Sequence, residues 1–291
     1  MLPQRVFLLT TLALLAFAAN SLLNRGALQY ELIGPGEFAV LRVAFGALTL
    51  FMLLAWRNKR LPRRQPIAFK GVVGLAAYIV GFSYAYVNLD AGLGALILFG
   101  TVQVVMFIAA AYAGERLSIY RWLGALIASL GLLVLFWPDK NVSLPLSGLI
   151  LMLLAAFGWA LYSLEGRRVN DPLLATTWNF IYVLPITLLV LLTEGGVGEA
   201  SGAGASLHIT TNGVLLALVS GSVMSGLGYA LWYWVLPKLD VTTGALAQLL
   251  VPVFALVLGA LFLQETVSLR AAMATALIVG GVAVGSLFKR A

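Results

Sequence analysis

Residues 89–96 read LDAGLGAL, and residues 239–246 read LDVTTGAL. A shift of 150 positions aligns these two stretches, and the same shift aligns Glu115 with Glu265 and Ser118 with Ser268. Over residues 89–118, eight of the thirty positions are identical to their counterparts. A shift of 140 aligns Ala16-Phe17 with Ala156-Phe157 in the same way. The sequence therefore predicts an internal repeat, with residues 1–140 as one unit and 141–291 as the other.

The segments around these stretches are apolar and long enough to cross a membrane. Of the 291 residues, 62% are hydrophobic and only 10% are charged, whereas soluble proteins carry about 25% charged residues. Apolar runs of about 20 residues, enough to cross the hydrocarbon core as a helix, recur along the chain. The predicted spans are residues 6–28, 37–56, 68–87, 92–112, 119–137, 146–164, 173–193, 214–236, 241–263 and 269–288. We expect an all-α integral membrane protein, with a flexible loop over the Gly-rich residues 194–213.

The positive charges predict the orientation in the membrane. Of the 18 Lys and Arg residues, fourteen fall on the side of the N-terminus, three on the other side, and Arg42 lies within a span. By the positive-inside rule both termini are cytoplasmic, in a membrane of the bacterial inner-membrane type. The basic loop RNKRLPRR (57–64) is then a membrane anchor rather than a nucleic-acid site.

Five spans per unit is an odd number, so the two units must lie in opposite senses in the bilayer. Two inverted five-helix repeats around a central cavity are typical of transporters that work by alternating access, with the binding site near the midplane. A non-transporting scaffold or an enzyme is the alternative class, but no catalytic constellation is visible. Cysteine is absent and the one histidine, His208, lies in a linker, which excludes disulfides, Cys-based metal sites and Cys–His catalysis. We expect no cofactor, no metal and no obligate protein partner.

Polar and aromatic side chains in mid-span are the candidates for binding a small-molecule substrate. An unpaired amide in hydrocarbon costs several kcal/mol, so Asn20 must face a cavity or another helix. Gln248 lies one turn before Pro252, whose missing N–H frees the carbonyl of Gln248. The predicted substrate-binding residues are Asn20, Tyr78, Phe82, Phe99, Trp159, Ser163, Tyr229 and Gln248. Ordinary core packing or interfacial belts are the alternative for the aromatic members.

Charged residues in or near the spans have two interpretations. Arg42, near Glu37, either fixes a substrate carboxylate or is structural, snorkelling or capping a neighbour. Glu115 and Glu265 occupy equivalent helix ends and, with Pro252, are predicted to serve gating or structural roles. The first span has no deep carboxylate, which argues against a proton-coupled exporter of lipophilic cations.

These residues also carry a family resemblance. Glu-Arg-Leu-Ser at 115–118, Leu41-Arg42, Gln-Glu-Thr-Val-Ser at 264–268 and the Gly-rich last span resemble the EamA-type members of the drug/metabolite transporter superfamily. Overall the chain is most similar to the aromatic amino acid exporters among them. The resemblance implies a ten-helix bundle whose cavity is lined by the first, third, fourth, sixth, eighth and ninth helices. Val102 stands where many relatives carry proline, so a kink in the fourth helix does not carry over.

The function that follows is export of amino acids, aromatic or bulky apolar ones above all, by alternating access. Export of drugs or other small amphipathic metabolites is the alternative.

Overall fold

The computed structural model describes residues 4–114, 118–136, 145–200 and 209–287, and within them the regular elements are helices. The helices of the first part are α1 (Gln4–Gln29), α2 (Pro35–Asn58), α3 (Phe69–Ala85), α4 (Ala91–Tyr112) and α5 (Ile119–Phe136). Those of the second part are α6 (Leu146–Gly166), α7 (Pro172–Ala200), α8 (Thr211–Val219), η1 (Ser220–Leu227), α9 (Gly228–Val235), η2 (Leu236–Lys238), α10 (Val241–Gln248), α11 (Val251–Phe262) and α12 (Leu269–Leu287). The predicted all-α fold class is confirmed.

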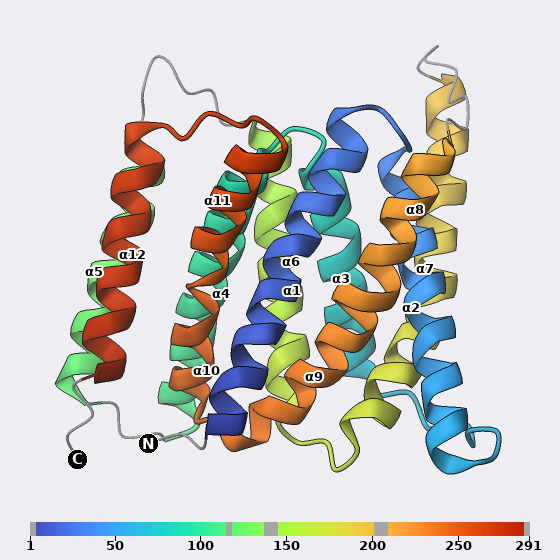
Figure 1. The fold of residues 1–291 in the computed structure, drawn as a ribbon, viewed down its shortest axis with the longest axis horizontal. Helices are drawn as coiled ribbons and strands as arrows, with labels where there is room; N and C mark the ends of the chain where they lie inside the picture. The colour runs from blue at the N-terminus through green and yellow to red at the C-terminus, as the bar shows by residue number, and fades with distance from the viewer. Residues whose placement is uncertain (1–3, 115–117, 137–144, 201–208, 288–291) are drawn as a thin grey trace.

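The helices are suited to a bilayer by length and composition. Within the described residues, seven helical runs, among them Thr211–Lys238 and Val241–Phe262, are long and apolar enough to cross a membrane, and α3, α5 and α12 are shorter apolar helices. They stand side by side and alternate in direction, so that α1 and α6 run in opposite senses (Figure 1). The first residue of α1 and the last of α12 lie at the same end, the lower end in Figure 1.

One predicted loop boundary is wrong. We expect residues 194–213 to be a loop, yet α7 continues to Ala200 and α8 already begins at Thr211. Adding a residue to an existing helix avoids the cost of nucleation, so α7 can continue through Gly residues that would not start a helix by themselves. Residues 201–208 lie outside the described part.

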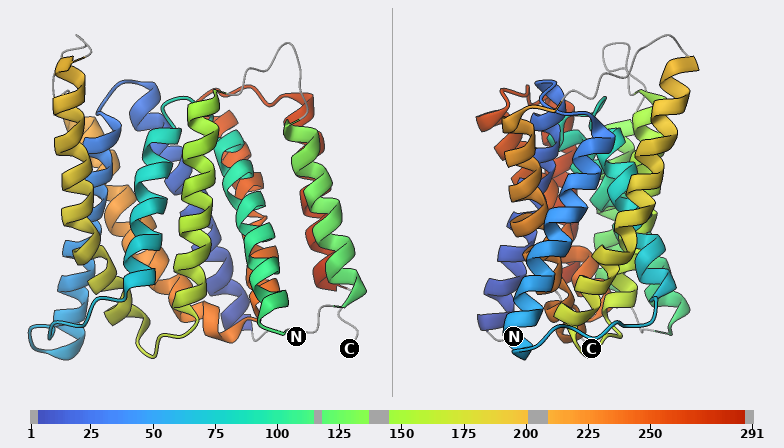
Figure 2. Two further views of the ribbon diagram at one scale, coloured as in Figure 1. Left: turned by 180° about the vertical axis from the view of Figure 1, so that it is seen from behind. Right: turned by 90° about the vertical axis from the view of Figure 1, so that its right-hand side faces the viewer.

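Small residues bring the helices into close contact. The most extensive pairings are α5 with α12, α3 with α6, and α2 with α7 (Figure 2). A Cβ on Gly124 of α5 would lie only 2.5 Å from the carbonyl oxygen of Gly281 in α12. Gly74 and Gly158 make a reciprocal contact of the same kind between α3 and α6. Such small-residue contacts replace the hydrophobic driving force that helices lack within lipid.

Two predicted spans are not regular α-helices. The span that begins at Thr211 contains the π-helical stretch η1, residues 220–227. The next span is interrupted between Gln248 and Val251, just before Pro252, as the missing proline N–H predicts. By contrast α4 is continuous through Val102. Irregular backbone within spans is frequent at functional sites.

Candidate functional site

The predicted substrate-binding side chains converge in the centre of the bundle. They come from α1, α3, α4, α6, α9 and α10, and none is more than 4% exposed. The group consists of Asn20, Tyr78, Phe82, Phe99, Trp159, Ser163, Tyr229 and Gln248. We call these eight residues the central cluster. Because they pack against one another, the centre is closed to solvent in this structure.

The close approach of α3 and α6 positions the aromatic members. A Cβ on Gly158 would lie 2.6 Å from the backbone of Gly74, so the two helices meet at this level. Tyr78 lies one turn after Gly74 in α3, Trp159 directly follows Gly158 in α6, and their ring centroids are 4.8 Å apart. Phe82 contacts Tyr78 with its ring centroid 5.0 Å away. The aromatic stripe therefore forms a wall between helices rather than a lipid-facing belt.

Tyr229 joins several helices through its hydroxyl group. It donates a hydrogen bond of 3.0 Å to the Tyr78 hydroxyl and accepts one of 3.3 Å from Asn20 Nδ2. Asn20 Oδ1 in turn accepts a hydrogen bond from Ser220 in η1. Of the two alternatives for Asn20, the structure has the hydrogen bond between helices. Its amide nitrogen and its amide oxygen thus each have a partner, in α9 and η1 respectively.

Gln248 and Trp159 form a second polar link. The Trp159 indole N–H donates a hydrogen bond of 2.6 Å to Gln248 Oε1. The Gln248 amide donates to the Gly244 carbonyl at 3.2 Å, within its own helix. Nearby, Ser163 accepts a 3.2 Å hydrogen bond from the Trp232 indole. The helix break after Gln248 thus lies beside a polar side chain that contacts another helix.

Some central residues escaped the sequence analysis. Phe17 lies among the rings, 5.0 Å from Trp159, 5.7 Å from Tyr229 and 6.4 Å from Phe99 by centroids. Ser220 and Ser225 face inward from η1. The periodicity of a regular helix could not predict that these two serines face inward, because a π-helical turn changes the face that each residue occupies. The three serines among the glycines of residues 220–228 were the available signal.

Arg42 lies deeper than a snorkelling side chain would. It is 0% exposed, and its guanidinium donates to Ser225 Oγ at 2.8 Å and to the Tyr78 hydroxyl at 3.2 Å. It also donates to the Tyr229 hydroxyl. Of the alternatives for Arg42, the structure does not show snorkelling to the interface, because hydroxyl groups and aromatic rings surround the guanidinium.

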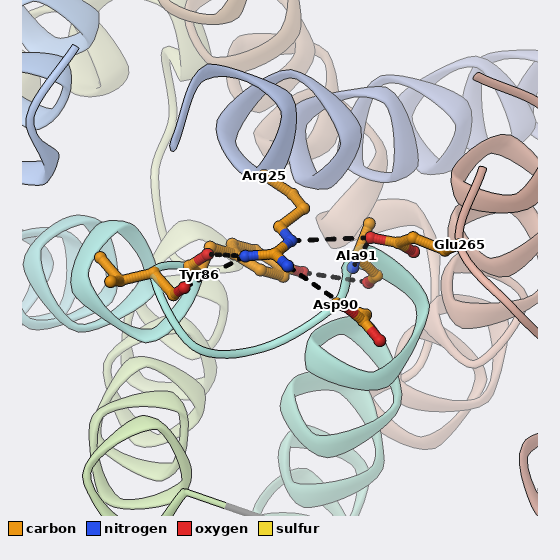
Figure 3. A network of polar contacts seen from close by, with 6 residues as sticks. Arg25, Tyr86, Asp90, Ala91 and Glu265 are labelled. Atoms are coloured by element: carbon orange, nitrogen blue, oxygen red, sulfur yellow. Dashed lines mark hydrogen bonds and ion pairs between the residues drawn. The ribbon is translucent and has the colours of Figure 1, made fainter. Parts of the chain in front are cut away.

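A cluster of charges joins three segments at the upper end. Arg25 donates to the Tyr86 carbonyl at 3.0 Å and to Asp90 at 3.3 Å, and its Nε is 3.8 Å from a Glu265 carboxylate oxygen (Figure 3). That same oxygen accepts a hydrogen bond of 2.8 Å from the Ala91 N–H at the start of α4. Burial raises the pKa of Glu265, although the Ala91 N–H and Arg25 act against that rise. Glu265, a predicted gate or structural residue, therefore ties the end of α11 to α1 and α4.

A similar cluster lies at the lower end. Arg121 of α5 pairs with Asp240 at 2.7 Å, and Asp240 caps α10 by accepting from the Thr243 N–H. Burial alone would raise the pKa of Asp240, but the hydrogen bonds from Thr243 and Arg121 hold it below its ordinary value. Arg167 donates to the Leu236 carbonyl at 3.2 Å. Leu236 and Asp240 are the residues that the 150-position shift aligns with Tyr86 and Asp90.

Of the remaining predicted residues, Pro252 is the second residue of α11 and Glu115 lies outside the described residues. The role of Glu115 stays a prediction.

Comparison with known sequences decides the family. The sequence model of the EamA-like transporter family matches residues 4–137 and again residues 146–287. The chain belongs to the EamA-like transporter family. This EamA-like protein is therefore a multi-pass membrane transporter, and the enzyme alternative does not fit the family.

Several relatives of this EamA-like transporter are bacterial proteins. An uncharacterized protein of Pseudomonas aeruginosa is 45% identical over 281 residues, covering 96% of this chain and 94% of its own. YoaV, an uncharacterized transporter of Bacillus subtilis, is 25% identical, covering 86% of each chain. A Salmonella typhimurium protein named "Probable amino-acid metabolite efflux pump" is 30% identical, covering 67% of each chain. A solved crystal structure with 21% identity covers 99% of each chain at a TM-score of 0.72, a likeness of fold alone.

Proposed function

We propose that this EamA-like transporter exports amino acids and related amphipathic metabolites, favouring aromatic or bulky apolar ones. The observation that carries the proposal is the central cluster itself. It combines aromatic walls with amide, indole and hydroxyl groups that already exchange hydrogen bonds between helices. A solute with an apolar side chain and a polar backbone presents the same two kinds of group. The name of the Salmonella typhimurium relative agrees with this substrate class.

The proposed mechanism is alternating access between two inverted five-helix units, residues 1–140 and 141–291. The double match of the family model supports the two units, and the opposite directions of α1 and α6 support their inversion (Figure 1). The charge clusters at the two ends support it further, since Tyr86 and Leu236 occupy aligned positions in them. In this mechanism the Arg25 cluster separates when the site opens at the upper end. The Arg121–Asp240 cluster separates when it opens at the lower end.

Transport assays test the substrate class. Inverted membrane vesicles containing the protein should accumulate radiolabelled phenylalanine and tryptophan above the level of vesicles without it. A Gly280→Ala variant is a suitable control, because a Cβ at that position meets nothing within 4 Å. Accumulation that is equal with and without the protein for every amino acid refutes the proposal. Competition by amphipathic drugs instead of amino acids would favour the drug-exporter alternative.

Cysteine labelling tests the inversion, and the native chain has no cysteine to interfere. Arg60 and Asn212 are exposed positions in or beside connecting segments of the two units. With cytoplasmic termini, Asn212→Cys should react with an impermeant maleimide in intact cells, and Arg60→Cys only after permeabilisation. Reaction of both from the same side would contradict the arrangement.

A further inference from the structure

Arg42 is a buried cation that forms no ion pair with any residue in the described part of the chain. Among the described residues, the ion pairs of arginine involve Arg25, Arg57 and Arg121, and none reaches Arg42. Its hydrogen-bond partners are three neutral hydroxyl groups, those of Ser225, Tyr78 and Tyr229. One guanidinium nitrogen, Nη1, is buried and has no hydrogen-bond partner within the described part of the chain.

A buried guanidinium without an opposite charge is energetically unfavourable unless a further group accepts its hydrogen bonds. Arginine does not give up its proton in proteins, so burial cannot neutralise Arg42. A buried charge that lacks an opposite charge is strongly destabilising, and the cost is higher within a membrane. The rings of Phe82 and Tyr78, 5.0 and 5.4 Å from the guanidinium carbon, stabilise a cation in part. They leave Nη1 without an acceptor.

We propose that Arg42 binds the carboxylate of the transported solute, which rests on the function proposed above and makes its substrate class more specific. A guanidinium presents paired N–H groups that match the two oxygens of a carboxylate. Nη1 supplies the free donor, and Nη2, now shared by two tyrosine hydroxyls, supplies the second once the site opens. The rings of Tyr78 and Phe82 then border the apolar part of the solute. The site takes organic anions and zwitterions and rejects amines that have no carboxylate.

A structural role for Arg42 makes a different prediction. If Arg42 serves only to join α2 to η1 through Ser225, its replacement by methionine should lower the thermal stability of the protein. If Arg42 waits for an anion, Arg42→Met removes an uncompensated charge, and the ligand-free protein should be as stable as wild type or more stable.

Binding to the purified protein tests the carboxylate site directly. The probes are 3-phenylpropanoate and its neutral amide, 3-phenylpropanamide, which differ in charge and little in shape. Wild type should bind the acid about tenfold or more tightly than the amide, the range of one charged hydrogen-bonded contact. Arg42→Gln should bind both probes equally. Arg42→Lys, which keeps the charge but loses the paired donors, should lose about tenfold in acid affinity. Arg57→Gln, which alters an exposed ion pair with Asp171, is the matched control and should keep the preference.

The proposal is overturned if wild type binds 3-phenylpropanoate no more tightly than 3-phenylpropanamide, or binds neither. It is also overturned by an undiminished preference in Arg42→Gln, or by a loss of stability in Arg42→Met. These binding results are separate from the vesicle assay, because a carboxylate preference can be measured whether or not the solute is transported. Failure of the transport proposal and failure of the Arg42 site are therefore distinguishable.

Discussion

Replacing Tyr229 by phenylalanine tests whether its hydroxyl organises the centre of the bundle. The ring is fully buried and stays in place, so the variant removes only the hydrogen bonds to Asn20, Arg42 and Tyr78. Hydrogen bonds between membrane helices average about 0.6 kcal/mol and reach about 1.7. Taking the larger value for the guanidinium bond and the average for the two others gives a loss of about 3 kcal/mol in unfolding free energy.

Tyr233→Phe is the matched control for this substitution. Tyr233 lies one turn further along α9, is equally buried, and donates a single hydrogen bond of 2.9 Å to the Tyr162 carbonyl. Its loss should cost about 0.6 kcal/mol. Unfolding in mixed micelles of increasing denaturing-detergent content, followed by tryptophan fluorescence, measures both variants. Equal losses for the two, or a smaller loss for Tyr229→Phe, would refute the idea that Tyr229 is the centre of the polar network.

Three further predictions follow from the other contacts. Trp159→Phe and Gln248→Leu each leave one polar atom unpaired, so a double-mutant cycle should give a coupling free energy of unfolding of about 1 kcal/mol between the two positions. Each variant should also lower vesicle transport without lowering the yield of folded protein. Gly158→Ala places a Cβ 2.6 Å from the α3 backbone and should cost about 1–3 kcal/mol, whereas Gly280→Ala, with open space around it, should leave the melting temperature unchanged or higher. Burial raises the pKa of Glu265 above its ordinary 4.5. The stability of wild type relative to Glu265→Gln should therefore be highest below pH 4.5 and fall as the pH rises through the pKa of the folded state. Melting temperatures of the two proteins that change in parallel from about pH 4 to about pH 8 would contradict this.

The fold could be predicted in large part because the bilayer restricts the choices. Apolar length fixes where helices lie, and the predicted spans agree with helices α1 to α7 and α12 to within a few residues, the far end of α7 excepted. Charge distribution and repeat symmetry then predict orientation and pairing. The irregular stretches within the spans were harder to predict from the sequence. Pro252 marked one of them, since proline lacks an N–H, but η1 contains no proline and gave no comparable signal.

The site could be predicted as a set of residues but not as a network. Deep polar groups must find partners, which singled out Asn20 and Gln248. The partners themselves, Ser220 for one and Trp159 for the other, come from helices distant in sequence. Arg42 shows the limit of the approach, because the sequence left open whether its side chain turns toward the interface or inward. Only the packing of α2 against η1 decides that.

The π-helical turn of η1 determines the directions in which the side chains after it point. A π-helical stretch holds more residues per turn than an α-helix, so it rotates the faces of the segments on its two sides relative to each other. Ser220 at its start and Ser225 within it consequently point to Asn20 and Arg42, and Tyr229 just beyond it points to both. Shortening the stretch by one residue to restore a regular helix would change the rotation between Ser220 and Tyr229 around the helix axis, and with it the direction in which Tyr229 points. The arrangement of side chains around Arg42 therefore depends on the number of residues in η1 as much as on which residues they are.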